Sequence, residues 1–253
     1  MKASIRVRLV VIVLSLAAFL AITAGCSKGS VSKIQAKLDT GIKANGQIEG
    51  DIALIQGANS KELDAQTKIL TARNEFTSIA TSSSGSTFPD QNLNDMQVGI
   101  NDLETVVGEH RLALNKLISD TQAANKTLAA LVSLAEKESA AEAGAIKRFV
   151  QKNAEVYRAQ VQGETARFNA VNRQLDLYKK QYEQLKATNT TDAATFNAAA
   201  DAFEKYAQEM VDVAEIDKKM IEALDSKTSD LNQAVLKIIS ELEDAGLDFK
   251  RQK

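Results

Sequence analysis

The sequence predicts an all-α protein, a long antiparallel helical bundle with coiled-coil heptads. Apolar residues recur in alternating steps of three and four through most of the chain, which is the pattern of a helical seam. The 253 residues include one proline and 12 glycines, whereas an all-β sandwich or barrel needs many turns. Two short polar segments interrupt the apolar pattern and separate stretches of similar length.

The strongest seam runs from Leu93 to Ala135 and keeps one phase for six heptads. Its two polar members are His110 and Thr121. A strict repeat of 3.5 residues predicts a left-handed supercoil against partner helices. The seam positions are Leu93, Met96, Ile100, Leu103, Val107, His110, Leu114, Leu117, Thr121, Ala124, Leu128, Leu131 and Ala135.

Two further seams follow, and each contains a four-residue stutter. The first comprises Ile146, Val150, Asn153, Tyr157, Val161, Glu164, Phe168, Val171, Leu175, Tyr178, Tyr182 and Leu185. The second comprises Phe196, Ala199, Phe203, Tyr206, Met210, Val213, Asp217, Met220, Leu224, Thr228, Leu231, Val235, Ile238, Leu242, Ala245 and Phe249.

The segment before residue 82 has the weakest pattern. Ile34, Leu38, Ile48, Ile52 and Ile55 keep the helical spacing. The glycines of this stretch each lower helix stability by about 1 kcal/mol relative to alanine; they are Gly41, Gly46, Gly50 and Gly57. Asn59 and Glu62 have the spacing of an N-cap and its third helical residue. We therefore expect a helix over 31–56, a break near Gly57 and a helix over 60–81.

The number of helices depends on residues 135–145, which are helix-forming in composition but lie where the seam changes phase. Ser139 and Glu142 have capping-box spacing, and Gly144 follows. A turn at 137–144 gives an up-down-up-down four-helix bundle; its segments are 31–81, 92–137, 145–187 and 192–250. Without the turn, 92–187 is one helix of about 140 Å. Near-equal segment lengths favour four helices over three.

The N-terminus has the three-part layout of a signal peptide. Lys2, Arg6 and Arg8 precede an apolar run over Leu9–Ile22, and small residues follow. The ending Thr23-Ala24-Gly25-Cys26 resembles the lipobox of prokaryotic lipoproteins, with Thr23 where leucine is usual. The resemblance implies that residues 1–25 are removed and that the Cys26 thiol carries a diacylglycerol. Residues 26–30 would then be a short linker and 31–253 a single elongated domain.

Two other readings of this segment are an uncleaved signal anchor and plain secretion. Residues 9–27 carry no charge and are just long enough to span a bilayer. In all three cases the body of the protein lies outside the cytoplasm. Removing residues 1–25 removes three positive charges, so 28 positive charges remain against 33 negative ones and the net charge falls from −2 to −5. An acidic body argues against nucleic-acid binding.

The sequence predicts no catalytic site, metal site or cofactor. One cysteine and one histidine exclude a cysteine-rich metal site and a histidine cluster. The serines of 82–86 lack a Gly-x-Ser-x-Gly context, and no phosphate-binding loop or dinucleotide fingerprint occurs. His110 follows Glu109, but position 107 is valine, so the Glu-x-x-His pair of di-iron bundles is absent.

Three polar seam residues form a candidate site within the bundle. His110, Glu164 and Asp217 occupy positions that a heptad normally fills with apolar residues, and the sequence shows no evident basic partner for the two acids. Asn125 and Asn189 lie in N-glycosylation sequons, of which Asn189 is the better acceptor because it lies in a predicted loop.

These features predict a non-enzymatic, lipid-anchored, extracytoplasmic helical bundle. We expect a structural, spacer or partner-binding role at the cell envelope, with a protein partner or self-association through the helices. The alternative is an extracytoplasmic sensor that binds a ligand or metal inside the bundle. In a four-helix topology both predicted loops lie at the tip far from the membrane, and the C-terminal Lys250, Arg251 and Lys253 return to the membrane end.

Overall fold

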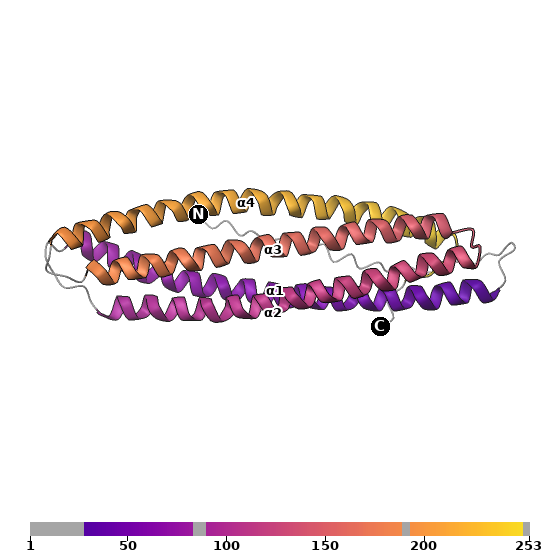
Figure 1. Ribbon diagram of the computed structural model, residues 1–253, viewed down its shortest axis with the longest axis horizontal. Coiled ribbons are helices and arrows are strands. Elements are labelled where there is room, and N and C mark those ends of the chain that lie inside the picture. The colour runs from indigo at the N-terminus through magenta and orange to yellow at the C-terminus, as the bar shows by residue number, and fades with distance from the viewer. Residues whose placement is uncertain (1–27, 83–89, 189–192, 250–253) are drawn as a thin grey trace.

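The protein is a rod of four long helices. The computed structural model describes residues 28–82, 90–188 and 193–249, and these contain helices and turns but no strand (Figure 1). The helices are α1 (Lys28–Ser82), α2 (Asp90–Lys137), α3 (Ala143–Thr188) and α4 (Ala193–Asp244). The four-helix prediction is therefore confirmed, and the alternative with one helix over 92–187 is wrong.

The helices run up, down, up and down, so their ends gather at two opposite ends of the rod. We call the end where α1 begins the proximal end and the end where α1 finishes the distal end (Figure 1). Helices of 46 to 55 residues correspond to lengths of about 70–80 Å at 1.5 Å per residue.

A Schellman motif makes the turn that the composition of 135–145 obscures. The Ala140 amide donates to the Ala135 carbonyl (3.0 Å), and the Ser139 amide donates to the Glu136 carbonyl (3.1 Å). Ser139 takes the left-handed conformation that this motif requires, with φ of 50°. The same motif ends α4, where Gly246 has φ of 92°.

Helix α1 is continuous, so the predicted break near Gly57 and the predicted N-cap at Asn59 are both wrong. The helix also begins at Lys28, three residues earlier than expected. Its buried seam continues through Ile55 and Ala58 across the glycine region, and tertiary packing of such a face outweighs a weak helix propensity. Gly41 contributes to the packing, because a Cβ there would lie 2.8 Å from Leu128 Cδ2.

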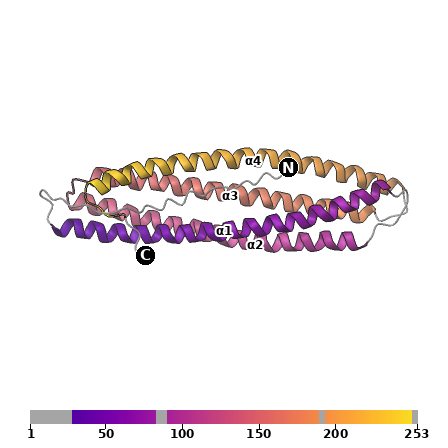
Figure 2. The same cartoon turned by 180° about the vertical axis from the view of Figure 1, so that it is seen from behind.

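The four helices form two hairpins rather than a square with four equal sides. Helix α1 packs along α2, and α3 packs along α4, while α2 and α3 join the two hairpins (Figure 2). Among the described residues, no Cα of α1 lies within 8 Å of a Cα of α4. Helix α4 therefore has only one close helical neighbour, α3.

Burial differs between helices according to this arrangement. All thirteen predicted seam positions of α2 are buried. Helix α3 buries a second row that the heptads did not predict, because it packs against α4 of its own hairpin and against α2 of the other. This row includes Phe149, Val156, Ala159, Ala166, Ala170 and Leu177. Several seam positions of α4 are only partly buried, and Met220 is exposed.

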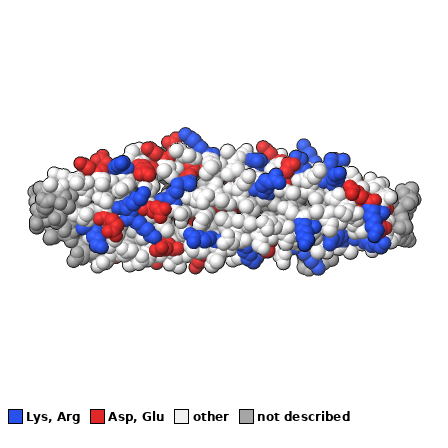
Figure 3. Space-filling view, in the orientation of Figure 1, with Lys and Arg blue, Asp and Glu red and all other residues white. Residues whose placement is uncertain are grey.

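The apolar interior is divided into two clusters. The proximal cluster consists of buried apolar residues within 34–55, 114–135, 146–157 and 235–247. The distal cluster consists of those within 65–72, 93–107 and 175–185, together with Met210. On the surface, charged side chains of both signs are interspersed, and fewer of them lie around the middle of the face in Figure 3. The interval between the two clusters is where polar side chains enter the bundle.

Candidate functional site

A set of polar side chains crosses the bundle between the two apolar clusters. All four helices contribute to this central polar layer; its members are Glu62 of α1, His110 of α2, Glu164 and Arg167 of α3, and Asp225 of α4. A layer of charge in the middle of an apolar seam is costly to bury unless its members are paired.

His110 and Glu62 form a buried pair between α2 and α1. His110 is 0% exposed, and its Nδ1 lies 2.8 Å from Glu62 Oε1. With Glu62 ionised, Nδ1 carries the proton and donates the hydrogen bond. The imidazole also meets the Phe168 ring edge to face, with centroids 5.4 Å apart, so the histidine is held from two sides.

Glu164, Arg167 and Asp225 form the other half of the layer. The Arg167 guanidinium donates to Glu164 Oε1 (2.8 Å) and also pairs with Asp225, which links α3 to α4. Burial raises the pKa of Glu164 above its ordinary value of 4.5, while the positive charge of Arg167 and the nearby His110 act in the opposite direction. Burial therefore disfavours the charged form of Glu164.

Two buried atoms of the layer have no hydrogen-bond partner within the described residues. They are Nε2 of His110 and Oε2 of Glu164. Unpaired buried polar atoms are uncommon in folded proteins, because each loses its hydration without replacement. These two atoms are the groups through which the layer would contact a small polar ligand or a water molecule.

The structure brings two of the three predicted site residues together. His110 and Glu164 belong to the same layer, and Glu164 pairs with Arg167, a basic partner three residues further along α3 that the seam pattern did not identify. Asp217, 4% exposed, instead pairs with Arg173 of α3. No group of three or more His, Cys, Asp or Glu residues that would suit a metal ion occurs in the part of the chain that the structure describes.

Asp51, a buried acidic residue of α1, escaped the sequence analysis because it lies beside the predicted seam. It pairs with Lys116 of α2, which also bonds Asp120. Burial raises the pKa of the Asp51 carboxyl, and the Lys116 ammonium opposes this rise. This pair would have been visible only with knowledge of which helix faces which. Tyr157, a predicted seam residue of α3, is buried as expected, and burial raises its pKa to about 12.

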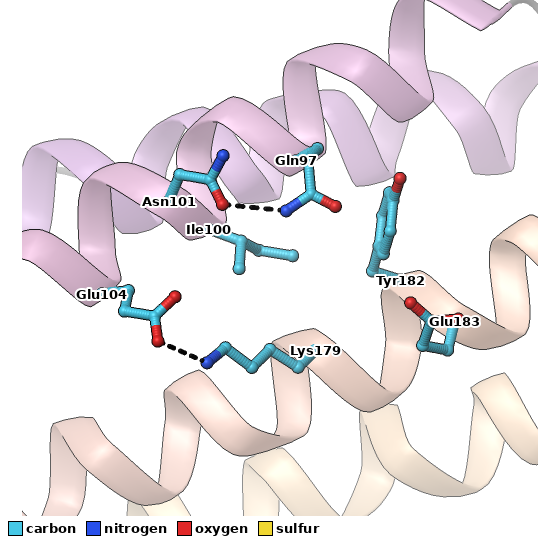
Figure 4. Close-up of a pocket in the computed structure, with 7 residues that line it drawn as sticks. All are labelled: Gln97, Ile100, Asn101, Glu104, Lys179, Tyr182 and Glu183. Atoms are coloured by element: carbon cyan, nitrogen blue, oxygen red, sulfur yellow. Dashed lines mark hydrogen bonds and ion pairs between the residues drawn. The ribbon is translucent and has the colours of Figure 1, made fainter.

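A shallow pocket lies between α2 and α3 on the distal side of the layer (Figure 4). Its volume is about 220 Å³, and its lining residues are Gln97, Ile100, Asn101, Glu104, Lys179, Tyr182 and Glu183. Lys179 Nζ donates to Glu104 Oε1 (3.0 Å), and Gln97 donates to Asn101 Oδ1 (2.9 Å). Four of the lining side chains therefore already bond one another, and Tyr182 and Glu183 are the other polar side chains of the lining.

Three predicted sites remain: the lipid attachment site Cys26 and the two glycosylation sequons at Asn125 and Asn189. Cys26 and Asn189 lie outside the described residues. Asn125 is half-buried within α2, which is not the surface loop that a glycosylation acceptor requires. None of the described helices has a stretch that is both apolar and long enough to cross a bilayer.

Comparison with known proteins adds no relative to these observations. No family model, no curated protein and no solved structure matches the chain. The functional argument therefore rests on the sequence and the geometry.

Proposed function

We propose that the protein is a lipid-anchored rod of the cell envelope that acts as a spacer or presents a binding surface away from the membrane. The proposal includes no enzyme activity, no cofactor and no nucleic-acid partner. One observation carries it: the rigid helix α1 begins at Lys28, two residues after the lipobox-like cysteine Cys26. An anchor at Cys26 would therefore connect to the rod with almost no slack.

The position of the C-terminus supports the same orientation. Gln35, near the start of α1, exchanges two hydrogen bonds with the backbone of Asp248, at 2.7 and 2.9 Å. Phe249 packs edge to face on Phe149 near the start of α3. The chain therefore returns to the proximal end just before its basic residues Lys250, Arg251 and Lys253, which suits an end close to anionic headgroups.

The distal end is the surface that such a rod would present. The connection from α1 to α2 and the connection from α3 to α4 both join helix ends at this end of the molecule (Figure 1). It lies about 80 Å from the start of α1, the length of a 55-residue helix. A partner recognised there would be held at that distance from the anchored membrane.

Fractionation of cells that express the full chain tests the anchor. We expect the native chain to sediment with membranes, to enter the detergent phase and to incorporate labelled palmitate. Cys26→Ser should abolish the label, because the thiol is the acyl acceptor. Ser27→Ala is the matched control and should behave as the native chain does.

Two outcomes would contradict the lipid anchor. Native chain that fractionates with soluble proteins would exclude any anchor. A Cys26→Ser variant that remains membrane-bound with residues 1–25 still attached would identify an uncleaved signal anchor instead.

A second candidate function is a ligand sensor, and the unpartnered His110 Nε2 and Glu164 Oε2 favour it. A small polar ligand that bonds both atoms would stabilise the fold by mass action. Thermal-shift screening against small polar metabolites and divalent metals would support the sensor if a compound raises the Tm of the native chain but not of His110→Leu. No shift with any compound would exclude it in favour of the spacer.

A further inference from the structure

Helix α4 carries an apolar stripe that the bundle leaves exposed. Ile216 is 65% exposed and Met220 is 41% exposed. Met220 is a predicted seam residue, and the bundle leaves it uncovered because α4 packs closely against α3 alone. Val211 of α4, 61% exposed, lies about 140° around the helix from Ile216 and is not part of this stripe. The remaining large exposed apolar residues belong to α1 and α2; they are Val31, Leu54, Leu63, Val98 and Leu112.

Ile216 and Met220 belong to a second heptad series along α4, which shares Val213 and Met220 with the predicted seam. Its members are Glu209, Val213, Ile216, Met220, Ala223 and Lys227, spaced by 4, 3, 4, 3 and 4 residues. Val213 is half-buried, and the other five are exposed. Such spacing places the six side chains in one row along the helix. A row with an apolar middle and charged ends is the pattern of a helix-pairing surface.

The row is complementary to itself when it is reversed about residue 218. The reversal places Ile216 opposite Met220, and Val213 opposite Ala223. It also places Glu209 opposite Lys227 at both ends of the row. An antiparallel coiled coil pairs its seam positions in this way, and opposite charges at the ends favour the register. A parallel pairing would oppose Glu209 with Glu209 and Lys227 with Lys227, which is repulsive.

We infer that the exposed row of α4 is a pairing surface for a second copy of this chain, bound antiparallel about a two-fold axis near residue 218. The axis falls at the midpoint of α4 (Ala193–Asp244), so the two rods overlap over their full length. The contact is isologous, since each copy offers the same row to the other.

The size of the row predicts a weak complex. It runs from Glu209 to Lys227, which is 19 residues or about 27 Å of helix, and this is short compared with the interfaces of stable dimers. The complex should therefore form and dissociate rapidly and depend on concentration. At each end of the row, Glu209 of one copy would pair with Lys227 of the other. These exposed ion pairs would select the register more than they would raise the affinity.

Antiparallel pairing has a consequence that rests on the lipid anchor proposed above. Two anchored copies that pair in this way have their Cys26 anchors at opposite ends of the overlapped rods. Such a pair would hold two facing membrane surfaces about 80 Å apart. Copies within one membrane, which stand parallel, would not pair through this row.

Charge reversal tests the pairing independently of the anchor. The probe is the mature chain from residue 26 with Cys26→Ser, which holds all four helices and has no site for the lipid. Sedimentation velocity over a concentration series should show a monomer–dimer equilibrium. Glu209→Lys alone and Lys227→Glu alone should each remain monomeric, because each variant opposes two like charges at both ends of the row.

Two combinations should restore the dimer. The double variant Glu209→Lys with Lys227→Glu exchanges the charges and recovers both ion pairs. An equimolar mixture of the two single variants should form a heterodimer, since every end then pairs lysine with glutamate. Lys218→Glu, placed about 200° around the helix from Ile216, is the control and should dimerise as the native chain does.

Three results would overturn the inference: a native chain that stays monomeric at every concentration, single variants that dimerise like the native chain, or mixtures that remain monomeric. Unfolding curves for each variant will show that the fold is intact, because both substituted residues are exposed. A native chain that takes up no palmitate label in the earlier experiment would exclude the anchor but not the pairing, so the two failures are distinguishable.

Discussion

At the scale of single residues, Ser139 is the most strained position of the described backbone. It is the described non-glycine residue with positive φ, and its left-handed conformation is needed to end α2. Ser139→Gly should raise the free energy of unfolding by about 0.5–1 kcal/mol, because glycine adopts this conformation without a steric cost. Urea unfolding of both chains measures the change.

Gly246 provides the matched control, since it occupies the same position of the motif that ends α4. Gly246→Ala should lower the unfolding free energy by about 1 kcal/mol. Equal stability of Ser139→Gly and the native chain would show that the turn at 138–142 does not depend on this conformation.

Removing one partner of the buried pair His110–Glu62 should lower the free energy of unfolding more than replacing both partners with apolar residues. His110→Leu leaves the Glu62 carboxyl buried without its partner and should destabilise the fold by about 3 kcal/mol. The double variant His110→Leu with Glu62→Leu should recover most of this loss, because two apolar residues continue the seam between the clusters. Chemical unfolding of the two singles and the double completes the cycle; additive losses would contradict a direct pairing.

Glu164 should make the stability depend on pH. Because burial raises its folded pKa above 4.5, the folded chain holds this proton more tightly than the unfolded chain does. The stabilisation is complete below 4.5 and is lost as pH rises through the raised pKa. Glu164→Gln mimics the protonated form, so it should be more stable than the native chain at pH 7 and equal to it at pH 4.

The opposite ordering, with the Gln variant less stable at pH 7, would mean that the bond to Arg167 outweighs desolvation. Glu222→Gln on the exposed face of α4 is the control and should leave the pH dependence unchanged. Thermal unfolding across this pH range measures both variants.

At the scale of elements, the glycines of α1 differ in what they contribute. A Cβ at Gly50 would meet no atom within 4 Å, whereas one at Gly41 would meet Leu128 at 2.8 Å. Gly50→Ala should therefore stabilise the protein by about 0.5–1 kcal/mol. Gly41→Ala should destabilise it, because the buried Leu128 side chain would have to shift within the packed core. Stabilisation by both variants in urea unfolding would show that α1 and α2 are packed more loosely than described.

All thirteen heptad positions predicted for α2 are buried, because this helix has close neighbours on both sides, α1 and α3. Gly99 and Val106, which the heptads did not predict, are buried as well. The same reasoning failed at Gly57, where a continuous seam overrides local propensity. It also failed to foresee that Met220 stays exposed, since exposure depends on the missing approach of α1 to α4. A heptad shows which face can pair but not whether the partner helix is present.

The candidate site was predictable only in part for the same reason. Polar residues at seam positions marked His110 and Glu164, and the structure places both in one layer. Arg167 could have been assigned to Glu164 from the sequence, because it lies three residues later on the same helix. Glu62 could not be assigned to His110, because a pair between two helices depends on their relative register. That register is a property of the assembled bundle.

At the scale of the whole molecule, the features form one consistent design. The rod begins at Lys28, two residues after Cys26 in the sequence, and the chain at Asp248 returns to the same end. Two pairs of consecutive helices have their joined ends at the far end. The buried pair of His110 and Glu62 in the central polar layer favours one register of α1 against α2, since sliding either helix would leave a buried polar group without its partner. The exposed row on α4 lies along the outside of the same rod.

The most direct test of the account is mass spectrometry of the N-terminus of the native protein purified from membranes. The lipid-anchored rod predicts that the first residue is Cys26 and that its thiol carries a diacylglycerol. A first residue other than Cys26, or Cys26 at the N-terminus with a free thiol, would contradict it.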